Sequence, residues 1–373
     1  MKKICVVLLL LLLLPSPVFA ADDPLHALLS EQMDMLDFSA MQNVVDLRPY
    51  GQGFAFGTLV ERAVRGELDL SPQGILTAFL SMLFREVRAN MSLLRNLLVI
   101  CLLSALLKNL TESFQNKGVG ELGFYVCYML LVTVLFSAFF TAASLASDVI
   151  RTLALLMQAS IPLLISLMIM SGTVGAAAFF SPTLAFAVNT ITIFVDGVLT
   201  PLIILSACIQ IVSSMTEKQL LTNFAALLKN ICTWGLRGIA AVFVAVLGLQ
   251  RITAPILTNA AARSARAALS AAPVVGGVLN SAWDVVFVWA EAAKSGVMVA
   301  FIITIILACL APALQMLALA LLFKLTAALI QPICDERLIT CLNEIGGFVF
   351  LLLGCLVTVM VMFILSVVIL LAL

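Results

Sequence analysis

The chain has 373 residues, of which 63% are hydrophobic and 11% are charged. A soluble globular domain is about half apolar and about a quarter charged, so the composition excludes a soluble fold and indicates an integral membrane protein. The 20 basic residues balance the 20 acidic ones, which excludes the basic footprint of a nucleic-acid-binding protein.

The first 20 residues resemble a secretory signal peptide. Two lysines precede an apolar core over residues 4–14, and a small-residue cleavage pattern ends at Ala20. The core is too short to span a membrane comfortably, so we expect cleavage after Ala20. The mature N-terminus then begins outside the cytoplasm.

Residues 21–90 have the only soluble composition in the chain, with five basic against ten acidic residues and a net charge of −5. Leucine and methionine at helical spacing predict one helix over residues 25–36. Ser71 as N-cap and Pro72 in the first turn predict a second, whose apolar stripe runs to Val87. A segment of about 70 residues buries only a small core, so we expect this acidic extracytoplasmic segment to pack on a partner or on the membrane.

Residues 91–373 predict an all-α, polytopic membrane domain of about seven to nine transmembrane helices. Each apolar run is long enough to cross a hydrocarbon core of about 30 Å. The runs on either side of Asp196 and of Pro312 have almost no polar loop between them, so each pair is a tight hairpin or one long kinked element. The nine candidate spans are 93–110, 122–146, 152–170, 176–195, 198–212, 231–249, 297–310, 313–330 and 348–373.

Charge predicts a topology for the first half of this domain only. With the N-terminus outside, the positive-inside tendency places Lys108 and Lys117 in the cytoplasm, and Lys218 and Lys229 follow them there. Counting one more span then places Arg251, Arg263 and Arg266 outside, which contradicts the positive-inside tendency. Either a span is miscounted, or residues 251–295 are not a simple external loop.

Residues 251–295 are rich in Ala, Gly and Ser and are interrupted by two prolines. They are too polar for an ordinary span and too apolar for a solvated loop. Small residues allow helices to approach closely, and non-helical backbone at membrane depth needs protein or water around it. We therefore expect a broken, re-entrant or interfacial hairpin, and the alternative is a helical surface loop anchored by Trp283 and Trp289.

Ionisable side chains inside apolar runs are costly and are therefore candidate functional residues. Four qualify: Lys324, Asp196, Asp284 and Arg237. Lys324 lies about midway along its span and is expected either to line an aqueous path or to pair with Asp196 or Asp284. A structural pair, an interfacial position or snorkelling is the alternative for each of the four. Few residues indicate chemistry: with one histidine, and with most of the nine cysteines at irregular spacing inside apolar runs, we expect no metal, no cofactor and no enzymatic activity.

Residues 331–347, QPICDERLITCLNEIGG, form a charged island between two long apolar runs. Pro332 ends the preceding helix, Asp335 caps a new one, and Gly346-Gly347 ends it. Apolar residues recur at i, i+3, i+4 and i+7, which predicts a short amphipathic helix lying flat in the membrane interface. Its apolar face comprises Leu338, Cys341, Leu342 and Ile345.

Four stretches carry a recognisable pattern: QPICDERLITCLNEIG after an FKLTAAL run, APVVGGVLNSAWDVV, NLTESF and FYVCYMLL. Together they resemble the stage III sporulation protein AE family of endospore-forming bacteria. The resemblance covers nearly the whole chain and is most specific over residues 331–342, where the family pattern favours glycine at the position of Cys334. The motif residues to which it gives a structural role are Gln331, Pro332, Asp335, Glu336, Arg337, Cys341 and Leu342.

The resemblance implies a multi-pass protein of the mother-cell membrane that surrounds the forespore. It implies a channel or export apparatus, of the SpoIIIA–SpoIIQ type, that is needed for late forespore gene expression and spore maturation. Other SpoIIIA-type membrane proteins, a SpoIIQ-type forespore protein and a membrane insertase are the implied partners, together with the lipid bilayer and without nucleic acid. A stand-alone secondary transporter and a non-conducting membrane platform are the alternatives.

Overall fold

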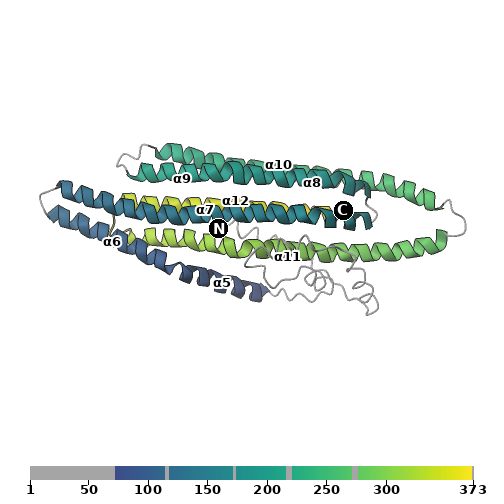
Figure 1. Cartoon of the computed structure of the whole chain (residues 1–373), viewed down its shortest axis with the longest axis horizontal. Helices are drawn as coiled ribbons and strands as arrows, with labels where there is room; N and C mark the ends of the chain where they lie inside the picture. Colours follow the sequence, from purple (N-terminus) through teal and green to yellow (C-terminus); the bar gives the residue numbers. More distant parts are fainter. Residues whose placement is uncertain (1–71, 114–116, 171–173, 216–220, 271–275, 372–373) are drawn as a thin grey trace.

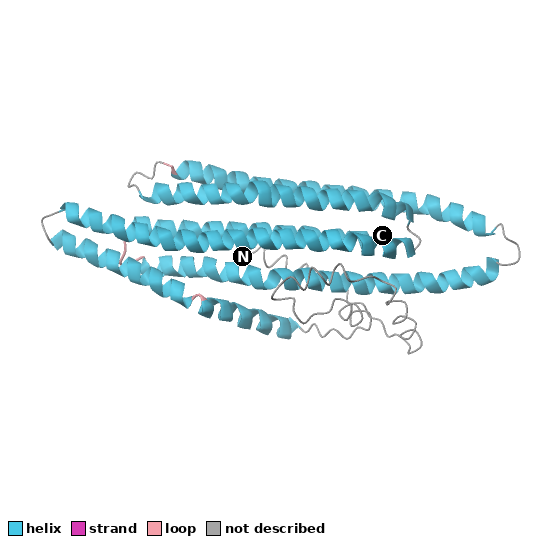
Figure 2. Cartoon of the chain, viewed as in Figure 1, coloured by secondary structure: helices cyan, strands magenta, loops and turns pink. Residues whose placement is uncertain are grey.

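A computed structural model describes residues 72–113, 117–170, 174–215, 221–270 and 276–371. The elements are α5 (Pro72–Ala89), α6 (Met91–Ser113), α7 (Lys117–Met170), α8 (Val174–Phe194), the π-helical turn η1 (Val195–Leu199), α9 (Thr200–Met215), α10 (Thr222–Ser270), α11 (Gly276–Ile330) and α12 (Glu336–Leu371). The helices lie side by side in one elongated bundle (Figure 1). All secondary structure in the described part is helical, as expected (Figure 2). The predicted signal peptide and the segment up to residue 71 lie outside the described residues.

Within the described residues, five helices are long and apolar enough to cross a membrane by length and composition, and the bent pair α5–α6 makes up to six. The five are Leu122–Ile169, Pro182–Met215, Thr222–Leu249, Gly296–Ile330 and Glu336–Leu370. The expected seven to nine are not confirmed, because several runs that we counted separately are continuous. The polar residues near Asp148 do not interrupt α7, Pro312 lies inside α11, and Asp196 lies in a π turn rather than in a hairpin loop.

The helices alternate in direction, so their ends gather at two ends of the bundle (Figure 1). The start of α7, the junction from α9 to α10 and the junction from α11 to α12 lie at one end, which we call the island end. The junctions from α7 to α8 and from α10 to α11 lie at the other end, with the end of α12. Lys117 and Lys229 therefore lie toward the same end of the bundle, and two long helical crossings separate them instead of the four predicted spans. Their cytoplasmic position stays a prediction.

Helix α12 occupies the middle of the bundle and packs against α7, α9, α10 and α11. Its inward side chains are closed off from the surroundings along most of its length: Leu342, Ile345, Leu352, Leu356, Val359, Phe363 and Val367 each have 0% exposure. The outer helices instead expose large apolar side chains, such as Phe186 at 73% and Phe140 at 53%. Apolar residues outside as well as inside are typical of helices surrounded by lipid.

The region 251–295 is helical wherever the structure describes it. Helix α10 continues to Ser270 and α11 begins at Gly276, so any break is confined to residues 271–275, which lie outside the described residues. Two helices joined by a short break are compatible with the expected hairpin and with the helical surface loop, so both stay predictions. The many alanines account for the helical course on both sides of the break, since alanine is the strongest helix former.

The charged island forms the first turns of α12 instead of a separate interfacial helix. Asp335 caps α12 as predicted, because its Oδ1 accepts a hydrogen bond from the Arg337 backbone N–H at 3.0 Å. The predicted apolar face is buried, with exposures between 0% and 1%. The predicted stop at Gly346-Gly347 is wrong, since α12 runs on to Leu371. These glycines are contact points: a Cβ at Gly346 would lie 3.3 Å from the Phe323 Cβ, and one at Gly347 would lie 3.2 Å from the Lys229 Nζ.

Candidate functional site

Asp196 forms an ion pair with a neighbouring helix, far from both ends of its own apolar stretch. Its Oδ2 accepts a hydrogen bond from Arg151 Nε of α7 at 2.7 Å. Asp196 lies 14 residues after Pro182 and 19 before Met215, which is about 21 Å and about 28 Å from the two ends of that apolar stretch at 1.5 Å per residue. The pair therefore lies far from either end of an otherwise apolar helix, where ionised side chains are usually functional.

The π-helical turn η1 positions this carboxylate. The backbone N–H and the hydroxyl of Thr200 both donate to the Val195 carbonyl oxygen, so this acceptor of the wider π turn is hydrogen-bonded. π-helical turns are rare and occur frequently at functional sites. The second carboxylate oxygen of Asp196, Oδ1, is buried and accepts no hydrogen bond from a described residue. A buried acceptor without a donor costs free energy, so this oxygen is available to a donor or a cation from outside the described residues.

A second polar group lies near the island end. Lys229 of α10 pairs with Glu344 of α12 at 3.0 Å and lies 4.9 Å from the Phe348 ring centroid. Lys324 of α11 donates to Asn343 Oδ1 at 3.0 Å. The prediction that Lys324 lies midway along its span is wrong, because the span runs over Gly296–Ile330 and Lys324 is six residues, about 9 Å, from its end. Its partner among the described side chains is Asn343 and not Asp196.

The motif residues gather at the start of α12. Arg337 lies 3.6 Å from Asp335 Oδ1 and 4.9 Å from the Phe124 ring centroid, so it ties the island to α7. Next to it, the Tyr128 hydroxyl donates to the Ile211 carbonyl of α9 at 2.8 Å. Three elements that are distant in sequence therefore meet here. Gln331, Pro332 and Glu336 are exposed at this end, whereas Cys341 and Leu342 are buried.

The cysteines behave as packing residues in the described part of the chain. All eight that the structure describes are free, and six of them are buried. Cys334 donates from Sγ to the Cys101 carbonyl at 3.3 Å. Burial raises the pKa of the Cys334 thiol above its ordinary value, so the thiol is protonated near neutral pH. The described residues contain no cluster of His, Cys, Asp or Glu able to hold a metal ion.

The remaining two candidates differ in position. Arg237 lies on an exposed face of α10, and its guanidinium carbon is 5.9 Å from the Trp234 ring centroid. The side chain of Asp284 lies outside the described residues. Among Lys324, Asp196 and Arg237, whose side chains the structure describes, no two are paired with each other. Sequence analysis missed Arg151, which was placed in a loop between two spans, and it missed the pairing of Lys229 with Glu344.

The comparisons with known proteins agree with one another. The chain matches the family described as stage III sporulation protein AE over residues 54–373. It is 33% identical over 262 residues to stage III sporulation protein AE of Bacillus subtilis (strain 168), and the matched segment covers 70% of this chain and 66% of that relative. No solved structure matches the chain significantly. The chain belongs to the stage III sporulation protein AE family.

Proposed function

We propose that this protein acts in endospore formation as a membrane subunit of an apparatus that links mother cell and forespore. Family membership supports the role in sporulation, and the five apolar helices support a place in a membrane. The proposed membrane is the mother-cell membrane around the forespore. The proposed partners are other SpoIIIA-type membrane proteins and a SpoIIQ-type forespore protein, and a membrane insertase for its integration. No enzymatic step is part of the proposal.

Within this role, the protein works by assembly rather than by conduction through its own bundle. The observation that carries this conclusion is the position of α12, whose fully buried apolar side chains fill the space between α7, α9, α10 and α11. A water-filled path would need polar or exposed side chains along its length. Any conduit in the apparatus is then formed between several chains.

The polar end of the bundle supports the same conclusion. Lys324 is bonded to Asn343 and lies near the end of α11, and Lys229 is paired with Glu344. These contacts join α10, α11 and α12 at the island end. We infer that they hold the helices in register, and that they do not line a path.

A second candidate function is a secondary transporter that acts alone. One observation favours it: Asp196, whose Oδ1 has no partner among the described residues, lies in a π-helical turn far from both ends of its apolar stretch. Interrupted helices with polar groups at this depth are typical of transporter binding sites. The unbroken course of α7, α11 and α12 favours assembly instead.

The test combines genetics with isolation of the native assembly. We expect a strain that lacks this chain to arrest before late forespore gene expression, and the full chain to restore maturation. We expect the tagged full chain, solubilised from sporulating cells, to migrate as a complex much larger than one copy. If the chain migrates alone while spores mature, or if the purified chain alone moves a small solute into liposomes, assembly is not its function.

A further inference from the structure

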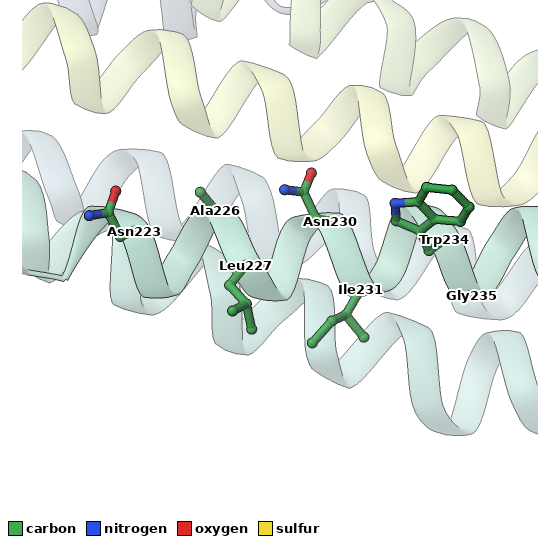
Figure 3. A pocket seen from close by; sticks show the side chains of 7 residues that line it. All are labelled: Asn223, Ala226, Leu227, Asn230, Ile231, Trp234 and Gly235. Atoms are coloured by element: carbon green, nitrogen blue, oxygen red, sulfur yellow. The ribbon is translucent and has the colours of Figure 1, made fainter.

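Three polar side chains follow one line along α10 at intervals of seven residues: Asn223, Asn230 and Arg237. Seven residues are close to two turns at about 3.6 residues per turn, so the three side chains share one face. All three are exposed. Figure 3 shows Asn223, Asn230 and Trp234 projecting from the same side of the helix. Helix α10 therefore presents a polar face, here called the Asn/Arg face, which the described helices leave uncovered.

The depth of this face makes its polarity costly. The apolar stretch of α10 runs over Thr222–Leu249, and Arg237 lies 15 residues after its start and 12 before its end. At about 1.5 Å per residue these distances are about 22 Å and about 18 Å, far more than an arginine side chain spans. The guanidinium cannot therefore reach the end of the stretch by snorkelling. Lipid tails offer its N–H groups no acceptor.

The described helices place no carboxylate against Arg237. Among the described residues its recorded contact is the ring of Trp234, which is 72% exposed. Lys229 precedes Asn230 on α10 and is turned by about 100° from it, and it is paired with Glu344. The basic side chain that turns toward α12 thus has an acidic partner, whereas the one that turns outward has none in the described part of the chain.

The surface beside the two asparagines is a shallow groove that could receive a second helix. Ala226 is small and lies between the two asparagines, and small residues let a second helix approach closely. Carboxamides at helix contacts in membranes act as hydrogen-bonding groups for a neighbouring helix. The shallow groove is lined by Asn223, Ala226, Leu227, Asn230, Ile231, Trp234 and Gly235 (Figure 3).

We propose that the Asn/Arg face binds a transmembrane helix of another protein that presents an Asp or Glu side chain opposite Arg237. The partner is chosen by charge: the positive charge of Arg237 requires an acidic side chain opposite it. A symmetric pair of two copies would bring the same face of α10 against itself, and hence Arg237 near Arg237, which like charges oppose. This inference rests on the proposed function, because it names the surface through which the subunit meets its assembly.

Photo-crosslinking in sporulating cells tests the proposal in the full chain. Benzoylphenylalanine is introduced at Ala241, on the Asn/Arg face, and at Val242 as the matched control. Val242 is 64% exposed but is turned by about 100° from its neighbour. We expect Ala241 to crosslink to a polypeptide whose crosslinked peptide, identified by mass spectrometry, is an apolar helix with one Asp or Glu. We expect Val242 to react chiefly with lipid.

Charge variants then test the pairing. Arg237→Glu and Arg237→Gln should lower the yield at Ala241 at least about fivefold, which corresponds to about 1 kcal/mol, and Arg237→Lys should retain most of it. Yields are normalised to the amount of chain in the membrane. Replacing the partner's acid by Lys should restore the crosslink to Arg237→Glu.

Four results would overturn the inference: only lipid adducts at Ala241, adducts to a second copy of the chain, equal polypeptide yields at the two positions, or an undiminished yield in Arg237→Glu. The comparison of Ala241 with Val242 is made with Arg237 intact, so it stands even if a charge variant fails to accumulate. Failure of the proposed function has a different signature, because a strain lacking the chain would then mature its spores normally.

Discussion

At the scale of single residues, the ion pair of Arg151 and Asp196 joins α7 to the π-helical turn η1. Among the described residues only one carboxylate oxygen of Asp196 has a partner, and the Asp196 side chain is 12% exposed whereas that of Arg151 is 65% exposed. The two groups therefore have unequal surroundings. Removal of Arg151 leaves a buried carboxylate without its donor, whereas removal of Asp196 leaves a guanidinium at the periphery.

We predict that Arg151 and Asp196 are energetically coupled. In a double-mutant cycle of Arg151→Gln and Asp196→Asn, the double variant should be more stable than the sum of the two single effects predicts, because each single substitution already removes the pair. The free energy of unfolding is measured in mixed micelles. A matched cycle of Asp196→Asn with Arg95→Gln on α6 should be additive. Additive effects of Arg151→Gln and Asp196→Asn would contradict the pairing.

Sequence reasoning identified Asp196 but not its partner, for a physical reason. The cost of a charge in an apolar run is visible from the run itself, so Asp196, Arg237 and Lys324 were found. A contact between residues 45 positions apart depends on how two helices pack, and periodicity carries no such information. Arg151 was missed because the short polar stretch around it suggested a connection between two spans. Helix α7 instead continues through this stretch.

At the scale of elements, α11 and α12 approach closely where the sequence has glycine. A Cβ at Gly346 would lie 3.2 Å from the Lys324 Cγ and 3.3 Å from the Phe323 Cβ, whereas a Cβ at Gly354 would meet nothing within 4 Å. The two glycines lie on the same helix but face different surroundings. The sequence alone suggested a helix end at Gly346, because glycine commonly follows the last turn, and only the neighbouring helix distinguishes that role from close packing.

We predict opposite effects of the same substitution at these two positions. Gly354→Ala should stabilise the protein by up to about 1 kcal/mol, because alanine favours helix more than glycine does. Gly346→Ala should be less stable than Gly354→Ala by about 1 to 3 kcal/mol, because the added methyl group crowds α11. Unfolding of the two purified variants in mixed micelles provides the comparison. Equal stabilities would mean that α11 and α12 are further apart than the structure places them.

At the scale of the whole molecule, the alternating helices give the chain two distinct ends. Lys117 at the start of α7 and Glu336 at the start of α12 lie at the island end, whereas Val174 at the start of α8 lies at the opposite end (Figure 1). The sequence predicted the shared side of the lysines from their charge. It did not predict the number of crossings, since the hydropathy of a long helix and that of two short ones look alike.

We predict that single cysteines at Lys117 and Glu336, in a cysteine-free chain, react with an impermeant thiol reagent from the same side of the membrane. A cysteine at Val174 should react from the other side only. The amount of reagent bound to intact and to inverted vesicles gives the answer. Reaction of Lys117 and Glu336 from opposite sides would contradict the topology, and the total accumulation of each variant serves as the control.

The central claim is that α12 fills the bundle, so that the chain acts through assembly and has no path of its own. The most direct test places single cysteines at Leu352, Leu356 and Val359, which are each fully buried in α12, in the full chain within membranes of sporulating cells. A cysteine at Glu336 is the accessible control. The account predicts that a small water-soluble thiol reagent modifies Glu336 readily and leaves the three α12 positions unmodified from either side. Modification of the three positions from both sides would reveal water along α12 and would contradict the account.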